Sequence, residues 1–150
     1  METKDKFNFE FLIGKGLGLV KFKDTNKQIF NVLGEPTEKL IDIYKQGVEE
    51  SSRYTFSHAG VVITRNMFES KYEPIKIFTE KIFINGHNLY DLCMKEIILN
   101  IEKIHKDNNI NIKVINEKDG FESCCEYPNI GLTIWFNNDE ELIDVCIELP

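Results

Sequence analysis

Residues 121–149 read FESCCEYPNIGLTIWFNNDEELIDVCIEL. Three segments of this stretch, 121–127, 132–136 and 142–149, alternate between apolar and polar residues. A period of two is typical of a strand that buries one of its faces. The stretch therefore predicts three neighbouring strands, each with a buried face and an open face.

Further strands are predicted along the rest of the chain, because short runs of alternating apolar residues recur between turn-forming residues. These runs are 7–13, 53–64 (two strands around a turn at 58–60), 75–84 and 110–114. Residues 38–45 fit a strand or a helix equally well.

Two segments carry helical signals. The first, about 24–33, has Thr25 where an N-cap belongs and is followed by Gly34 and Pro36, which end helices. The second, about 89–106, can be capped by Asn88 and has apolar residues three and four positions apart on one stripe. The stripe consists of Leu89, Leu92, Cys93, Ile97, Ile101 and Ile104.

Many short strands with only two helices among them favour an antiparallel sheet covered by helices on one face over a parallel βαβ array. The chain of 150 residues has the usual size of one domain. We therefore expect a single α+β domain over residues 1–150, with a twisted, mainly antiparallel sheet of about six to eight strands, one short helix and one long helix.

The net charge of −7 is unevenly distributed along the chain. Residues 1–116 contain 17 Lys and Arg and 16 Asp and Glu, whereas residues 117–150 contain nine acidic residues and one Lys. An acidic field repels nucleic acid and anionic membranes and attracts basic proteins. With only two arginines in the chain, we expect a basic protein partner and no binding to nucleic acid or membranes.

The cysteines and the apolar runs indicate the compartment. No apolar run reaches the length of a signal peptide or of a membrane span, so we expect a cytoplasmic protein. Cys93, Cys124, Cys125 and Cys146 form no CxxC pair, and adjacent residues of a strand face opposite ways. We expect four reduced thiols and no disulfide.

The sequence contains no recognisable catalytic, metal or cofactor motif. The glycines of residues 14–18 lack the spacing of a phosphate-binding loop, and the three histidines lie far apart at His58, His87 and His105. No serine lies in a G-x-S-x-G motif. We therefore predict no catalytic residue, no metal and no cofactor. Two alternatives stay open: a small enzyme that uses scattered carboxylates, and a ligand-binding domain with its pocket between the long helix and the sheet.

The predicted partner surface lies on the open face of the three C-terminal strands. Alternation groups Glu122, Cys124 and Glu126; Thr133 and Trp135, opposite Leu132, Ile134 and Phe136; and Asp144, Cys146 and Glu148, opposite Ile143, Val145, Ile147 and Leu149. Trp135 would then stand among carboxylates, either packed beneath a loop or helix or anchoring a partner. The predicted partner-binding residues are Glu122, Glu126, Trp135, Asp139, Glu140, Glu141, Asp144 and Glu148.

Residues 13–37 resemble a pattern found in small bacterial domains, in which a glycine-bearing turn and a short extended piece lead into a helix that closes on L-G-x-P. The residues that carry it are Gly16-Leu17-Gly18, Phe22 and Leu33-Gly34-Glu35-Pro36, with Ile134-Trp135-Phe136 and the acidic turn adding a little. The pattern is similar to that of immunity proteins of bacterial polymorphic toxin systems, including contact-dependent growth inhibition. The resemblance implies a cytoplasmic protein that binds and neutralises a cognate toxin, often a nuclease.

Overall fold

The chain forms a large antiparallel sheet with two α-helices and two small sheets. The computed structural model describes residues 8–44, 48–68, 71–72, 74–104, 113–116 and 122–150. In the described residues the α-helices are α1 (Asn26–Leu33) and α2 (Met94–Lys103), and the 3₁₀ turn η2 spans Leu89–Asp91. The strands are β1 (Phe11–Leu12), β2 (Gly16–Leu17), β3 (Val20–Lys21), β4 (Glu38–Tyr44), β5 (Val48–Phe56), β6 (Val61–Phe68), β7 (Lys71–Tyr72), β8 (Lys76–Thr79), β9 (Phe83–Ile84), β10 (His87–Asn88), β11 (Lys113–Asn116), β12 (Glu122–Tyr127), β13 (Leu132–Asn137) and β14 (Leu142–Ile147).

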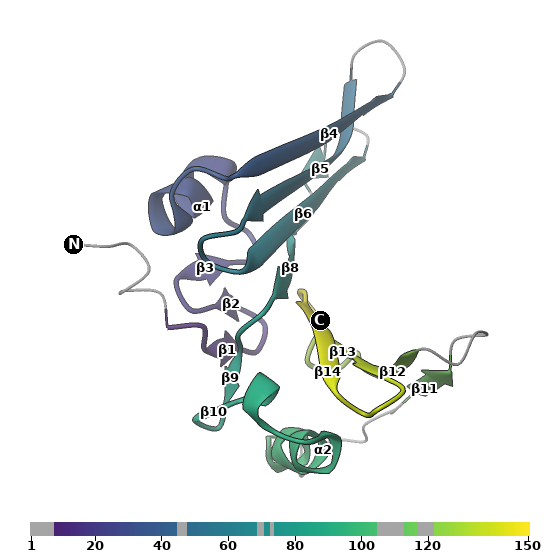
Figure 1. The fold of residues 1–150 in the computed structure, drawn as a ribbon. Helices are drawn as coiled ribbons and strands as arrows, with labels where there is room; N and C mark the ends of the chain where they lie inside the picture. Colours follow the sequence, from purple (N-terminus) through teal and green to yellow (C-terminus); the bar gives the residue numbers. More distant parts are fainter. Residues whose placement is uncertain (1–7, 45–47, 69–70, 73, 105–112, 117–121) are drawn as a thin grey trace.

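The large sheet has the order β11-β12-β13-β14-β8-β6-β5-β4, and β7 pairs with β6 outside this path. All of its pairings are antiparallel. The strand direction changes progressively across the sheet, from β4 at one edge to β11 at the other (Figure 1). The predicted α+β class is confirmed, and the eight strands of the main path meet the upper limit of the predicted number.

The first helix confirms the local signals in the sequence. The Thr25 hydroxyl accepts the backbone N–H of Gln28, and the Gln28 side chain in turn accepts the backbone N–H of Thr25. This reciprocal capping box satisfies two N–H groups at the start of α1. The helix ends at Gly34, as expected.

The second helix is shorter than predicted. Residues 89–91 form a 3₁₀ turn capped by the Asn88 side chain, Leu92 and Cys93 are extended, and α2 begins at Met94. The break has a local cause, because the backbone N–H of Cys93 donates to the Glu96 side chain and so starts a new helix; this bond also lowers the pKa of Glu96. Cys93 is exposed, so its predicted place on the apolar stripe was wrong. Residues 105 and 106, including His105, lie outside the described residues.

Three predicted strands differ in extent. The ambiguous segment 38–45 is the edge strand β4. Of the predicted strand 7–13, only Phe11 and Leu12 pair as β1, with Phe7 outside the described residues, and the predicted strand 75–84 divides into β8 and β9 around residues 80–82. The predicted strand 110–114 begins at Lys113 in the described part of the chain.

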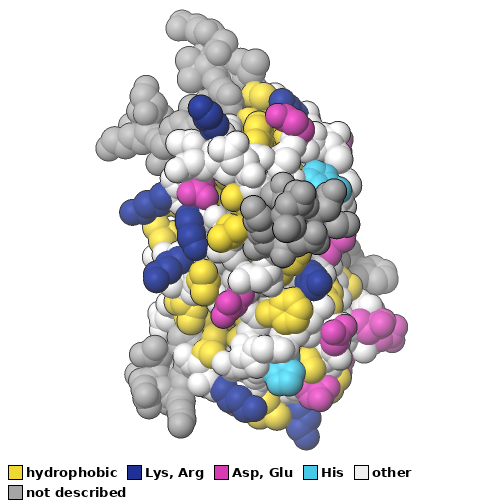
Figure 2. Space-filling view, turned by 90° about the vertical axis from the view of Figure 1, so that its left-hand side faces the viewer, with side chains coloured by type: hydrophobic (Ala, Val, Ile, Leu, Met, Phe, Trp, Pro, Cys, Tyr) yellow, Lys and Arg dark blue, Asp and Glu magenta, His cyan; other side chains and the backbone are white. Residues whose placement is uncertain are grey.

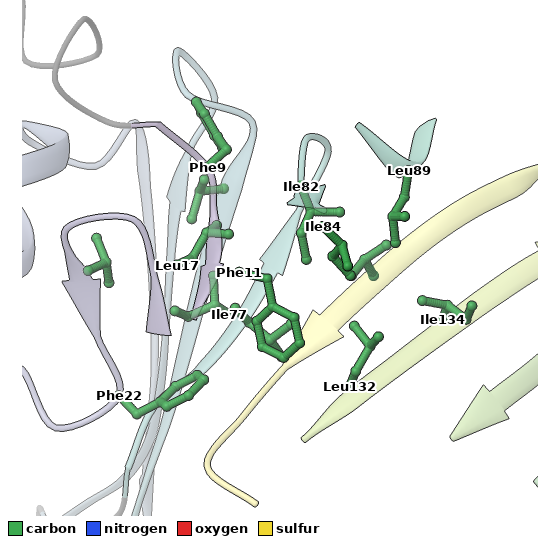
Figure 3. Packing of buried hydrophobic residues seen from close by; sticks show 14 of the residues in the cluster. Phe9, Phe11, Leu17, Phe22, Ile77, Ile82, Ile84, Leu89, Leu132 and Ile134 are labelled. Carbon is green, nitrogen blue, oxygen red and sulfur yellow. The ribbon is translucent and has the colours of Figure 1, made fainter. Parts of the chain in front are cut away.

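The core lies between one face of the large sheet and the elements that cover it. In Figure 1, α1 and the three-stranded sheet β1-β2-β3 lie on one side of strands β4–β8. Phe11 of the small sheet, Ile77 of β8 and Leu132 of β13 belong to one cluster of buried side chains, part of which Figure 3 shows. In α2, Ile97 and Ile101 belong to the same cluster of buried side chains. The opposite face of the large sheet is therefore the face available for function.

Candidate functional site

The C-terminal strands alternate as predicted, apart from one bulge. Leu132, Ile134 and Phe136 of β13 are buried towards the core. In β14 the register shifts, so that Leu142 pairs with Phe136 and Asp144 pairs with Trp135. The extra residue, Ile143, is 41% exposed, and its predicted place on the core face was wrong. A bulge inserts one residue against its partner strand and turns that side chain out of the alternation.

Two aromatic rings from different strands meet on the open face. Trp135 of β13 and Phe78 of β8 stack with their ring centroids 6.4 Å apart and their planes inclined by 26°. Since β14 lies between β13 and β8, the two rings span β14. Cys146 of β14 pairs with both Phe78 and Thr133, and it is only 4% exposed although its face was predicted to be open. We attribute the burial of Cys146 to this aromatic pair.

The burial of the cysteines changes their chemistry. All four are thiols, with Cys93 exposed and the others buried. Burial raises the pKa of Cys146 to about 12, assisted by the carboxylates of Glu148 and Asp144 and opposed by the ammonium of Lys76. Burial likewise raises the pKa of Cys125. Because the thiolate is the reactive form, buried thiols of high pKa react slowly with disulfide reagents.

A thiol assay tests the aromatic pair directly. In a Cys93→Ser background, which removes the exposed thiol and keeps a good N-cap residue, we expect slow labelling at pH 8. Trp135→Ala should uncover Cys146 and raise its labelling rate on the order of tenfold. Mass spectrometry of the labelled peptide identifies the cysteine, and titration in denaturant should still count three thiols. An unchanged rate for Cys146 would show that Trp135 does not cover it.

A groove of about 570 Å³ lies on the open face, next to the aromatic pair. It is formed by β5, β6, β8 and β14, and the residues that line it include Arg53, Val62, Phe78, Glu80, Ile143 and Asp144. Its lining is more apolar than polar, and the paired side chains of Val62 and Phe78 lie between the charged groups at its two ends. The acidic end carries Glu80 and Asp144, and Arg53 lies on β5 nearer the other end.

The acidic end contains two carboxylates that lie close to one phenol. The Tyr90 hydroxyl donates to the backbone oxygen of Thr79 at 2.7 Å. Burial raises the pKa of Tyr90, and the nearby charges of Asp144 and Glu80 add to that rise. An Oδ1 atom of Asp144 accepts the backbone N–H of Val145. Two strands thus place negative charge around the same end of the groove.

The predicted partner-binding residues divide into separate groups. Trp135 and Asp144, which alternation placed on the open face, are directly paired across β13 and β14. Glu126 pairs with Thr133, one strand farther from the groove, and Glu148 forms an ion pair with Lys76 at 3.9 Å. Glu122 begins β12, and its side chain lies outside the described ones.

The acidic turn at Asp139, Glu140 and Glu141 does not line the groove but lines a different hollow. It is held by the Asn137 side chain, whose oxygen accepts the backbone N–H groups of Asp139 and Glu141. These residues line that hollow, of about 500 Å³, together with residues 90–95 at the start of α2. The predicted acidic surface is therefore not continuous, because the hairpin carries its turn beyond the end of the groove.

The sequence analysis missed Phe78, Glu80 and Arg53. Alternation through 76–80 could have placed Phe78 and Glu80 on the face opposite the buried Ile77 and Thr79. Nothing in the sequence indicated that β8 is the neighbour of β14, which is the pairing that brings these residues to Trp135 and Asp144.

The remaining motifs have structural roles in the described residues. Gly14 and Gly18 lie at the turns that join β1, β2 and β3, so the glycine-rich segment forms two tight hairpins. Among the described residues, no group of three or more His, Cys, Asp or Glu could hold a metal ion. Neither of the described α-helices combines the length and the apolar composition that a membrane-spanning helix needs.

No protein-family model, curated protein or solved structure matches this chain. The site must therefore be interpreted from its own geometry. On the side of the molecule that faces the viewer in Figure 2, basic, acidic and apolar side chains are interspersed. The groove and the aromatic pair, by contrast, combine a lining that is more apolar than polar with carboxylates at one end.

Proposed function

We propose that this protein is a non-catalytic binding module, and specifically an immunity protein that binds and neutralises a cognate toxin domain. The observation that carries the proposal is the open face of the large sheet, where the Phe78–Trp135 pair adjoins an apolar groove with Glu80 and Asp144 at one end. Aromatic side chains set among polar groups are the usual centres of binding energy in protein interfaces.

The charge of the chain supports a basic partner. Nine of its 25 acidic residues lie in the last 34 positions, which contain one Lys. A nuclease toxin presents a positive surface, because its substrate is a polyanion. A complementary acidic surface accelerates association and disfavours wrong partners. A nuclease is therefore the toxin class that this surface fits best.

The proposal is tested with the protein encoded beside this gene, because an immunity gene should follow its toxin. Purified toxin domain and this protein should form a stable complex, and co-expression should protect cells from the toxin. A catalytically inactive variant of the toxin allows binding to be measured, because cells that produce this variant survive. Absence of both binding and protection would contradict the immunity function.

Trp135→Ala should weaken the complex by about 2 kcal/mol, roughly thirtyfold, mainly through faster dissociation. Asp144→Lys should instead slow association and reduce its dependence on salt. Glu35→Lys, an exposed acid beyond the end of α1, changes the net charge equally and is the control for Asp144→Lys. Both rate constants are measured at two salt concentrations on folded variants. Affinities within twofold of the wild type for Trp135→Ala would place the interface elsewhere.

A further inference from the structure

The groove has a defined order of side chains across its strands. Phe78 pairs with Cys146 on one side and with Val62 on the other. Glu80 directly follows β8 and lines the same end of the groove as Asp144 of β14, and both carboxylates act on the Tyr90 phenol. Asp144 in turn pairs with Trp135. The acidic end therefore has Phe78 two residues before Glu80 and Trp135 directly across from Asp144.

Glu80 is held at the acidic end of the groove by Gly60. The backbone N–H of Glu80 donates to the carbonyl oxygen of Gly60 at 2.9 Å. A Cβ atom on Gly60 would lie 2.9 Å from Oε2 of Glu80 and 3.2 Å from its Cβ, so the Glu80 side chain rests against the bare glycine. The turn between β5 and β6 thus fixes the position of one carboxylate at the acidic end.

The acidic end of the groove carries two carboxylates beside two aromatic rings. A cation bound at this end would interact with the carboxylates and would lie beside the Phe78 and Trp135 rings. The basic group Arg53 lies in the row of Thr64 and Lys76, four residues or about 13 Å farther along the strands, so the groove is polarised.

We propose that the acidic end of the groove binds an arginine side chain of the basic partner, with its guanidinium between Glu80 and Asp144 and against the Phe78–Trp135 pair. This inference rests on the proposed function and specifies the group that the surface recognises. Arginine fits better than lysine, because its planar guanidinium can donate to two carboxylates at once and stack on aromatic rings.

The site is tested with a peptide, without the toxin. The probe is acetyl-Gly-Arg-Gly-amide, titrated into the ¹⁵N-labelled protein and followed by NMR. The matched control replaces arginine with citrulline, which has nearly the same shape and no charge. We expect saturable shifts, in the millimolar range, of the backbone amides of Phe78, Glu80 and Asp144 and of the Trp135 indole. The citrulline peptide should produce none of them, and a lysine peptide should bind at least about threefold more weakly.

Variants locate the binding. Glu80→Gln and Asp144→Asn should each weaken peptide binding on the order of fivefold, whereas Glu35→Gln should leave it unchanged. Gly60→Ala should also weaken binding, because the new methyl group displaces Glu80. Gly86→Ala is its matched control: its φ of 78° resembles the 66° of Gly60, and a Cβ there would meet no atom within 4 Å. Thermal unfolding of both glycine variants separates backbone strain from the loss of the site.

Each outcome decides the inference. Equal shifts with the citrulline peptide, shifts centred on Asp139–Glu141, or no shift at 50 mM peptide would overturn it. The two proposals also fail differently. If toxin binding depends on Trp135 but is unaffected by Glu80→Gln and Asp144→Asn, the immunity function stands and the arginine site is wrong. If the peptide binds as expected and the neighbouring toxin does not, the arginine site stands and the immunity function is wrong.

Discussion

Replacing Ile97 with alanine should lower the free energy of unfolding by about 2–5 kcal/mol. Ile97 lies in the middle of α2, is 0% exposed, and belongs to the core cluster. The loss combines the apolar surface no longer buried with the cavity that remains in a packed interior. Urea unfolding followed by circular dichroism measures the change.

Leu99→Ala is the matched control in the same helix. Leu99 is 50% exposed, so its truncation should change the stability by less than about 1 kcal/mol. A loss below about 0.5 kcal/mol for Ile97→Ala would mean that α2 does not pack on the core as described.

Asn100→Ala should lower the free energy of unfolding by roughly 1–3 kcal/mol, because Asn100 is a buried polar residue with several hydrogen-bond partners. Its amide nitrogen donates to the backbone oxygen of Ile84 at 2.8 Å. The Asn85 side chain donates to both the backbone oxygen and Oδ1 of Asn100, at 3.0 and 3.2 Å. These bonds join α2 to the turn between β9 and β10, and alanine leaves the Ile84 carbonyl buried without this donor.

A second substitution separates lost hydrogen bonds from lost volume. Asn100→Asp keeps the shape but places a carboxylate against the Ile84 carbonyl, so it should cost at least as much at neutral pH. Asn138→Ala, in the exposed turn after β13, should stay within about 0.5 kcal/mol of the wild type. If Asn100→Ala and Asn138→Ala have the same stability, the network at Asn100 contributes nothing.

Local signals predicted the elements well. Thr25 caps the start of α1 and Gly34 caps its end, as the sequence predicted. Both ends were predictable because the capping box and the helix end each involve residues only a few positions apart. The same kind of signal explains the error at α2. Asn88 does cap a turn, but a second local start at Cys93, with Glu96 three residues on, competes with it and divides the segment. The spacing of apolar residues continues across the break, so periodicity alone could not reveal it.

The candidate site was only half predictable. Trp135 and Asp144 lie on adjacent strands of one hairpin, and alternation placed both on the open face. The bulge at Ile143 depends on how two strands settle against each other, which a single strand's pattern does not encode. Phe78 and Glu80 come from a strand far away in the sequence, and their neighbours are fixed by the tertiary fold.

The pairing of β8 with β14 has a consequence for how the protein folds. Phe78 and Cys146 are 68 positions apart, whereas β12, β13 and β14 pair through short turns. Closing so long a loop costs chain entropy before any contact rewards it, so the two halves of the sheet should join after their hairpins form. Trp135 is the only tryptophan of the chain, and its ring meets Phe78 across that joint. The fluorescence of Trp135 should therefore change when the two halves join, and the groove, which takes side chains from both halves, should form in that same step.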